Sequence, residues 1–319
     1  MKNLLNLKYS IIGLSLFFIP LWSLAQVKRV ETVDLTVKNL KASIRFFNQV
    51  LGFEKVDTAM VQTRNLEKVR MKLGDEYIEL IQYKKVKGRP IPANMKSNDL
   101  YFQHIAIVVR DIDSAYAILR KYMASPISPM PQTLPKSNKV AAGIRAYYFH
   151  DIDHHDLELI YFPEGKGQEK WHVQTSKLFL GIDHTAIGIS HTDKSLHFYE
   201  DLLGIPKKGE SLNEGIEQMN LSNVKGAKVH ITGIRADNGP GIEFLQYLKP
   251  GPGKPYPKDT KKYDLWYWQI VLVADHLDSL YQSLKEKKYH FFTPLTHSGN
   301  SGSYFVVQDP DGHALLIRN

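Results

Sequence analysis

The sequence predicts an α+β fold in which four βαβββ modules form two curled eight-stranded sheets, each shaped as a cup. The main observation is an internal repeat: residues 32–53 align without a gap with residues 184–205, and residues 99–105 align with residues 264–270. Each unit also ends in a short apolar strand, at residues 78–83, 157–160, 242–247 and 315–317. A repeated unit of this kind buries its apolar face only against a sister unit.

The elements follow from periodicity. Residues 104–109 alternate between a small set and a bulky, branched set, as does the stretch 184–189, which is typical of strands. We expect the bulky set to pack beneath a helix and the small set to leave room for a ligand. Apolar residues recur at helical spacing after each strand, with Asp113 or Asp278 as N-cap and with Gly52 and Gly204 at left-handed C-caps.

The N-terminus has the pattern of a secretory signal peptide. Lys2 and Lys8 precede an apolar run at residues 11–22 that is too short for a membrane span, and Ala25 offers a small residue for cleavage. We expect residues 1–25 to be removed, no stable membrane insertion, and a periplasmic or secreted protein that begins near Gln26. An anchor that is never cut is the alternative interpretation.

Composition limits the chemistry. The chain has no cysteine, so any metal must be held by histidine and by carboxylate or amide groups. The net charge of +8 is spread over loops, without the interleaved basic and aromatic residues that would indicate nucleic-acid binding. Connectors rich in Pro, Gly and Lys at 88–98, 163–177 and 250–262 separate the units. They predict a first domain of two modules at 26–165 and a second at 178–319.

Polar residues recur at two fixed positions of the repeat. The first strands supply Thr32, His104, His184 and Gln269 at one shared position, and the last strands supply Glu79, Glu158, Glu243 and Leu316 at another. Charged groups in apolar strands need partners, since burying a charge alone costs several kcal/mol. A divalent cation would satisfy them together.

Two pieces of sequence carry a resemblance to a known family: the run from His184 through Leu203-Gly204, and Asp309-Pro310-Asp311-Gly312 before the last strand. The chain resembles the vicinal oxygen chelate superfamily, which includes glyoxalases, bleomycin-resistance proteins and extradiol dioxygenases, from about Val30 to the C-terminus. The resemblance implies that paired modules form a cup and hold a metal through one residue of the first and one of the last strand of each module.

Module pairing decides which ligands meet. Pairing in sequence order leaves each cup one ligand short. Crosswise pairing of the two central modules brings together His104, Glu158, His184 and Glu243, and leaves Glu79 and Gln269 in a degenerate outer cup. We favour the crosswise arrangement because both histidines lie in adjacent modules. Tyr247 is then expected to line the central cup without touching the metal.

The resemblance implies one divalent metal ion (Zn, Ni, Co, Mn or Fe(II)) and a small-molecule substrate. Glu158 or Glu243 would serve as the catalytic base, and the sequence does not say which. The expected function is that of an exported, metal-dependent isomerase or lyase, glyoxalase-like or epimerase-like, acting on a small hydroxycarbonyl or keto compound. The alternatives are an extradiol-type Fe(II) dioxygenase and a non-catalytic binding protein of the bleomycin-resistance type. We expect no partner subunit.

A second group of possible metal ligands lies at Asp151, Asp153, His154, His155 and Asp156. Its position in the repeat matches the hairpin at 309–312, however. We therefore expect an exposed turn there rather than a second metal site.

Overall fold

The structure is a computed structural model that describes residues 27–297 and 302–319. The signal peptide expected at residues 1–25 lies outside the described residues and stays a prediction. Among the residues described, no helix is both long and apolar enough to span a membrane.

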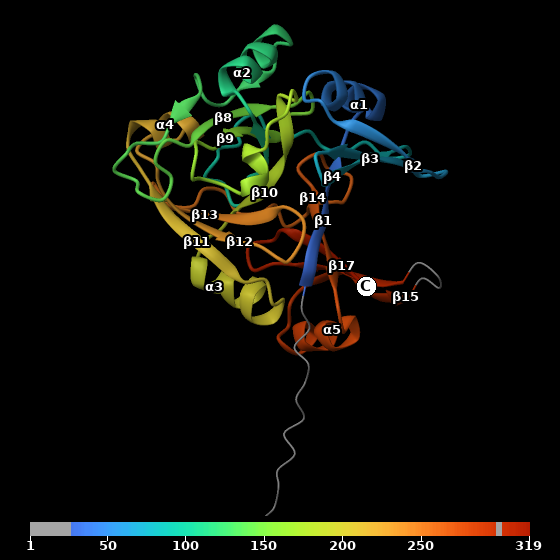
Figure 1. Ribbon diagram of the computed structural model, residues 1–319. Helices are drawn as coiled ribbons and strands as arrows, with labels where there is room; N and C mark the ends of the chain where they lie inside the picture. Colours follow the sequence, from blue (N-terminus) through green and yellow to red (C-terminus); the bar gives the residue numbers. More distant parts are fainter. Residues whose placement is uncertain (1–26, 298–301) are drawn as a thin grey trace, which may run out of the picture.

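The four modules follow one another along the chain as the repeat predicts (Figure 1). The first module comprises β1 (Val27–Thr36), α1 (Leu40–Gln49), β2 (Glu54–Gln62), β3 (Leu66–Leu73) and β4 (Glu76–Tyr83). The second comprises β5 (Gln103–Val109), α2 (Ile112–Lys121), β6 (Ser125–Pro126), β7 (Gln132–Thr133), β8 (Arg145–His150) and β9 (Asp156–Tyr161), and is followed by a short 3-10 helix, η1 (Glu169–His172).

The other two modules make up the second half. The third comprises β10 (Phe179–Gly188), α3 (Thr192–Leu196), a π-helical turn η2 (His197–Leu202), β11 (Lys207–Asn213), α4 (Ile216–Ser222), β12 (Lys228–Ile234) and β13 (Gly241–Lys249). The fourth comprises β14 (Trp268–Ala274), α5 (Leu277–Glu286), β15 (Phe291–His297), β16 (Ser303–Gln308) and β17 (Ala314–Arg318).

The sheets form crosswise, as favoured from the sequence. One sheet, here called the central sheet, runs β11-β12-β13-β10-β5-β9-β8-β6 and joins the second and third modules. The other, the outer sheet, runs β15-β16-β17-β14-β1-β4-β3-β2 and joins the first and fourth. The first strands of the paired modules meet antiparallel in the middle of each sheet. Among the described strands, neither sheet closes into a barrel.

The outer sheet has the predicted 8 strands, but the central sheet has 9. The additional strand arises because β6 and β7, of 2 residues each, replace one continuous strand, and both pair with β8. Pro126, Pro129 and Pro131 lie in this stretch. Proline has no N–H to give to a ladder, so it interrupts the strand.

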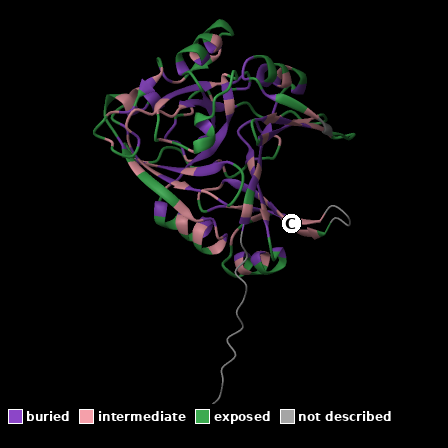
Figure 2. Cartoon of the chain, viewed as in Figure 1, coloured by how far each residue is buried: buried purple, intermediate pink, exposed green. Residues whose placement is uncertain are grey.

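The apolar cores combine the modules in a different way. Helices α1 and α2 lie together at one end of the molecule and α3 and α5 at the other (Figure 1), and buried residues concentrate on the strands between them (Figure 2). One core cluster joins the first and second modules, and another joins the third and fourth. Each half of the chain therefore shares a core, while each sheet takes one module from each half.

The predicted strand alternation and the predicted helix C-caps hold at the elements that position the site. Ile105, Ile107 and Val109 lie in the core, so that His104 faces the concave side of its sheet. Gly52 and Gly204 have φ of +74° and +71° after α1 and η2, which is the left-handed conformation expected of a C-cap.

The hairpin at residues 151–156 is not the exposed turn that we predicted. Asp151, Asp153 and His155 are all buried, because this hairpin packs against the ends of strands in the other sheet. His155 Nε2 lies 3.0 Å from the carbonyl of Thr36 and 2.9 Å from that of Leu265, and its Nδ1 lies 2.8 Å from Asp151 Oδ2. The histidine ring thus fastens the central sheet to the outer one.

The corresponding hairpin of the fourth module makes the same connection. His313 Nε2 lies 2.8 Å from the carbonyl of Gly188 in the central sheet, and Asp309 Oδ1 accepts hydrogen bonds from the backbone of its own turn. The predicted equivalence of the two hairpins is correct. Their shared role is to join the sheets.

Candidate metal centre

Four adjacent strands of the central sheet carry the predicted ligands. Strands β5 and β10 lie side by side, and β9 and β13 flank them. Each glutamate pairs with an alanine two residues beyond a histidine, Ala106 beside Glu158 and Ala186 beside Glu243. The small alanines leave room between the larger side chains.

Three of the four side chains converge closely. Glu158 Oε2 lies 3.0 Å from His104 Nε2 and 3.4 Å from His184 Nε2. One ligand atom from each of these three buried residues lies within 4.8 Å of the other two. Glu243 is outside this group but adjacent to it, with Oε2 3.3 Å from His184 Nε2, and its side chain is 29% exposed against 6% for Glu158.

The two carboxylates differ in electrostatics. Burial opposes the charge of Glu158, but the adjacent His104 and His184 outweigh it and lower its pKa. For Glu243, burial dominates and raises the pKa. Burial works against the charge of His184, yet the negative carboxylates around it, first of all Glu243, raise its pKa well above the ordinary value.

The site fits a divalent cation. His104 Nε2 and His184 Nε2 are buried and lack a hydrogen bond of good geometry among the described residues, which is unusual for buried polar atoms unless another group completes them. Two imidazoles and one or two carboxylates suit Zn²⁺, Fe(II) and similar ions. His104, Glu158 and His184 would hold the ion, and Glu243, the fourth predicted ligand, lies next to His184 beside this group.

Asp183 supports His184 from behind, and sequence analysis missed it. Its Oδ2 accepts a hydrogen bond from His184 Nδ1 at 3.0 Å, which leaves Nε2 free for a metal. Trp171 Nε1 and Arg235 Nη2 donate to Oδ1 at 3.0 and 3.1 Å and hold the carboxylate in place. Strict alternation would place Asp183 on the opposite face from His184. A register irregularity between Ile182 and His184 brings both to one site.

The outer sheet carries the degenerate set. Glu79 is neutralised by ion pairs of 2.6 Å with Lys68 and 2.7 Å with Arg70, so the protein's own cations stand where a metal would be needed. Gln269 accepts a hydrogen bond of 3.0 Å from Tyr267, and Leu316 offers no ligand atom.

Thr32, the last member of that set, donates a hydrogen bond of 2.8 Å to Asp34. Sequence analysis also missed Asp34. Burial, together with Glu79 beside it, raises the pKa of Asp34 to about 7.

Insertions cover the concave face of the central sheet. Helix α4 interrupts one hairpin, and a loop at residues 134–144 extends the other. The loop contacts the end of β11, where Asn138 Nδ2 donates to Asn213 Oδ1 at 2.6 Å. Helix α4 contacts the segment between β6 and β7, where Ser128 Oγ donates to the carbonyl of Leu221 at 2.6 Å. An apolar cluster beneath them contains Phe102, Tyr148 and Tyr247, so Tyr247 is buried inside the cup.

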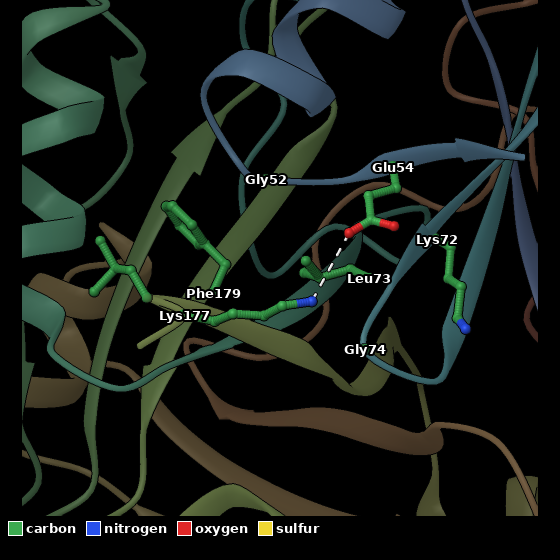
Figure 3. Close-up of a pocket in the computed structure, with 8 residues that line it drawn as sticks. Gly52, Glu54, Lys72, Leu73, Gly74, Lys177 and Phe179 are labelled. Atoms are coloured by element: carbon green, nitrogen blue, oxygen red, sulfur yellow. Dashed lines mark ion pairs between the residues drawn. The ribbon is translucent and has the colours of Figure 1, made fainter. Parts of the chain in front are cut away.

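The ligands reach solvent on one side. A cavity of about 260 Å³ is lined by His184 and Glu243 together with residues of β11 and β12. Another hollow, of about 280 Å³, lies between Gly52, Gly74 and Phe179 and is bordered by an ion pair of 3.8 Å between Lys177 and Glu54 (Figure 3). No histidine lines this second hollow, and it is separate from the candidate metal centre.

The family model of the Glyoxalase/Bleomycin resistance protein/Dioxygenase superfamily matches the chain twice, at residues 29–159 and 181–317. The chain belongs to this superfamily. No curated protein matches the sequence significantly.

Solved structures of this superfamily agree in fold. Glyoxalase I from Zea mays is 13% identical, with a TM-score of 0.65 and 92% of each chain covered. A Bacillus subtilis protein provisionally named a dioxygenase is also 13% identical, with a TM-score of 0.58, over 92% of this chain and 85% of the other. At such identity the likeness concerns the fold alone.

Proposed function

We propose that this superfamily member is a metal-dependent isomerase or lyase that moves a proton next to a carbonyl of a small hydroxycarbonyl or keto compound. The observation that supports it most is the unequal pair of glutamates around two buried histidines. A divalent cation held by His104, Glu158 and His184 would supply the Lewis acidity that makes a C–H bond beside a carbonyl acidic.

Glu243 is the base in this proposal. Glu158 is buried between two imidazoles, which keep it ionised and in place. Glu243 contacts His184, faces the cavity and has a raised pKa, so its carboxylate is suited to take up a proton from a substrate carbon and to return it. The pseudo-symmetry of the sequence leaves the choice between the two open, and the difference in exposure favours Glu243.

The test uses chain loaded separately with Zn, Ni, Co, Mn or, under anaerobic conditions, Fe(II). Metal content is measured by elemental analysis, and solvent deuterium incorporation into a panel of small hydroxycarbonyl and keto compounds is followed by NMR. We expect about one metal per chain and exchange of the proton beside the carbonyl. Glu243→Gln should keep the metal and lose exchange by about 10²- to 10⁴-fold, the usual effect of removing a general base.

Glu79→Gln is the matched control, because it changes the equivalent glutamate of the outer sheet and should leave both metal content and exchange unchanged. Exchange that survives in Glu243→Gln but is lost in Glu158→Gln that still holds its metal would assign the base to Glu158. A chain that binds no metal after supplementation belongs to the non-catalytic binding class.

A second function is favoured by one specific observation. The three converging residues are two histidines and one carboxylate, the set that non-haem Fe(II) oxygenases use with open positions for substrate and dioxygen. An extradiol-type dioxygenase would require Fe(II) and would consume oxygen with catechols. It would also keep its activity in Glu243→Gln. Oxygen-electrode measurements on wild type and on Glu243→Gln therefore separate the two functions.

Export is part of the proposal. A protein secreted or delivered to the periplasm would meet few glutathione or CoA adducts, which favours sugars, keto acids or hydroxycarbonyl compounds as substrates. N-terminal sequencing of chain recovered from a periplasmic fraction tests this, with Gln26 as the expected first residue.

A further inference from the structure

The two halves of the central sheet differ sharply at the position that lies across from each glutamate. Strand register sets Tyr148 beside Glu158 in the second module, and in the third module it sets Gly233 beside Glu243. The Tyr148 side chain is buried, with its ring 4.8 Å from that of His104. The same position in the outer sheet also carries side chains, those of Arg70 and Val306. Of these four described positions, Gly233 alone has none.

The missing side chain accounts for the exposure of Glu243. Tyr148 covers one side of the centre, where the Glu158 side chain is 6% exposed, whereas the Glu243 side chain next to Gly233 is 29% exposed. The opening continues outward, because Gly233 pairs in turn with Gly209 on the edge strand β11. Both glycines line the same cavity as His184 and Glu243.

The backbone does not demand glycine at either position. Neither residue has a positive φ, and a Cβ added to either would meet nothing within 4 Å. Glycine weakens a strand, since it adds no side chain to pack and gains backbone entropy on unfolding. A strand glycine often marks a bulge or a place where another molecule approaches the backbone closely. Gly209 follows a register shift of β11, whereas Gly233 lies in regular pairing with β13, so close approach is the remaining reason for Gly233.

We propose that Gly209 and Gly233 form the substrate entrance of the metal centre and limit the size of the substrate. This inference rests on the proposed function of the site. The cavity of about 260 Å³ is slightly smaller than the roughly 300 Å³ at which the usual sizes of ligand pockets begin. The substrate is therefore a compact compound, which enters across these glycines and reaches the centre beside Glu243.

The test measures ligand access in Co(II)-loaded chain, without turnover. Acetohydroxamate, a small bidentate oxygen ligand, and benzohydroxamate, its bulkier analogue, are titrated while the cobalt absorption bands are followed. In Gly233→Val we expect unchanged cobalt content and acetohydroxamate binding at least about tenfold weaker, because the added methyl groups fill the entrance, with a larger loss for benzohydroxamate. Gly233→Ala should fall between wild type and Gly233→Val, and Gly209→Val should affect benzohydroxamate most.

Leu212→Val, an exposed change on the same edge strand, is the matched control and should bind both probes as wild type does. Unchanged affinity of cobalt-loaded Gly233→Val for both probes would overturn the proposal. If Gly233→Val fails to hold cobalt, the same comparison is made with Gly233→Ala, and unchanged affinity of that variant for both probes would overturn the proposal. Failure of wild-type chain to hold cobalt would instead overturn the proposed function, so the two failures are distinguishable.

Discussion

Identical residues at equivalent positions of the repeat have different environments in this molecule. Glu79, Glu158 and Glu243 occupy one position of the module, yet the first pairs with Lys68 and Arg70, the second lies between two histidines, and the third faces a cavity. The cross-strand neighbour decides each case, because it provides a cation, a covering ring or an open space. A carboxylate's role therefore depends on the side chain beside it as much as on its own position.

The ligand assignment makes a prediction at this scale. His104→Ala and His184→Ala should each abolish tight metal binding, because either change removes one of two imidazoles from the centre. Gln269→Ala changes the same repeat position in the outer sheet, where the glutamine is held by Tyr267, and should leave metal binding intact. Elemental analysis after dialysis measures the difference. Equal losses in His184→Ala and Gln269→Ala would contradict the assignment.

At the scale of elements, the ends of helices and hairpins depart most from prediction. Helix α2 is capped by Asp111, whose Oδ1 accepts from Ser114 N at 2.6 Å, and not by Asp113, which pairs with Arg145 at 2.8 Å. Asp278 likewise lies in the first turn of α5, after His276 at the N-cap. Sequence spacing identifies both helices but misplaces their first residues. In α2 two acidic side chains compete for the cap, whereas the N-cap of α5 makes no side-chain cap hydrogen bond.

The buried hairpin histidine predicts a dependence of stability on pH. Burial opposes the charge of His155, but Asp151 outweighs it and raises the pKa to about 9. Because the folded-state pKa exceeds the unfolded value of about 6.5, the stabilisation is complete below pH 6.5 and is lost as the pH rises through 9. The full effect on the free energy of unfolding is on the order of 3 kcal/mol.

Urea unfolding of metal-free chain between pH 6 and 10 measures how the free energy of unfolding changes with pH. The slope of this plot should be shallower in His155→Gln than in wild type. In His197→Gln, which changes an exposed histidine, the slope should equal that of wild type. Parallel curves for wild type and His155→Gln would show that the linkage between the sheets is independent of the charge of this ring.

The whole molecule interlocks its two halves. Each half contributes one apolar core, and each sheet draws one module from each half, so separating the halves would disrupt both sheets. Residues of the second and third modules from a single chain build the candidate metal centre. In the outer sheet β3 follows β2 with no helix between them, whereas α4 separates β11 from β12 in the central sheet (Figure 1).

We therefore predict that the active chain is a monomer with about one metal. Because both halves of the centre come from the same chain, metal content and activity should not change on dilution. Sedimentation across a wide concentration range, combined with metal analysis of each sample, tests this. Loss of metal as a dimer dissociates would show that a partner chain completes the site.

The sequence alone determined the repeat and the module order. It also determined the alternation that turns His104 and His184 to the concave face of their sheet, and the two positions of each module at which ligands can occur. These features are local or periodic, and a repeated pattern records them directly. Only the tertiary structure decided which modules share a sheet, that Asp183 turns toward His184 at a strand irregularity, and that the hairpin of His155 is buried against the opposite sheet. It also distinguished Glu243 from Glu158, since the residues beside them, Gly233 and Tyr148, are neighbours across strands and not along the chain.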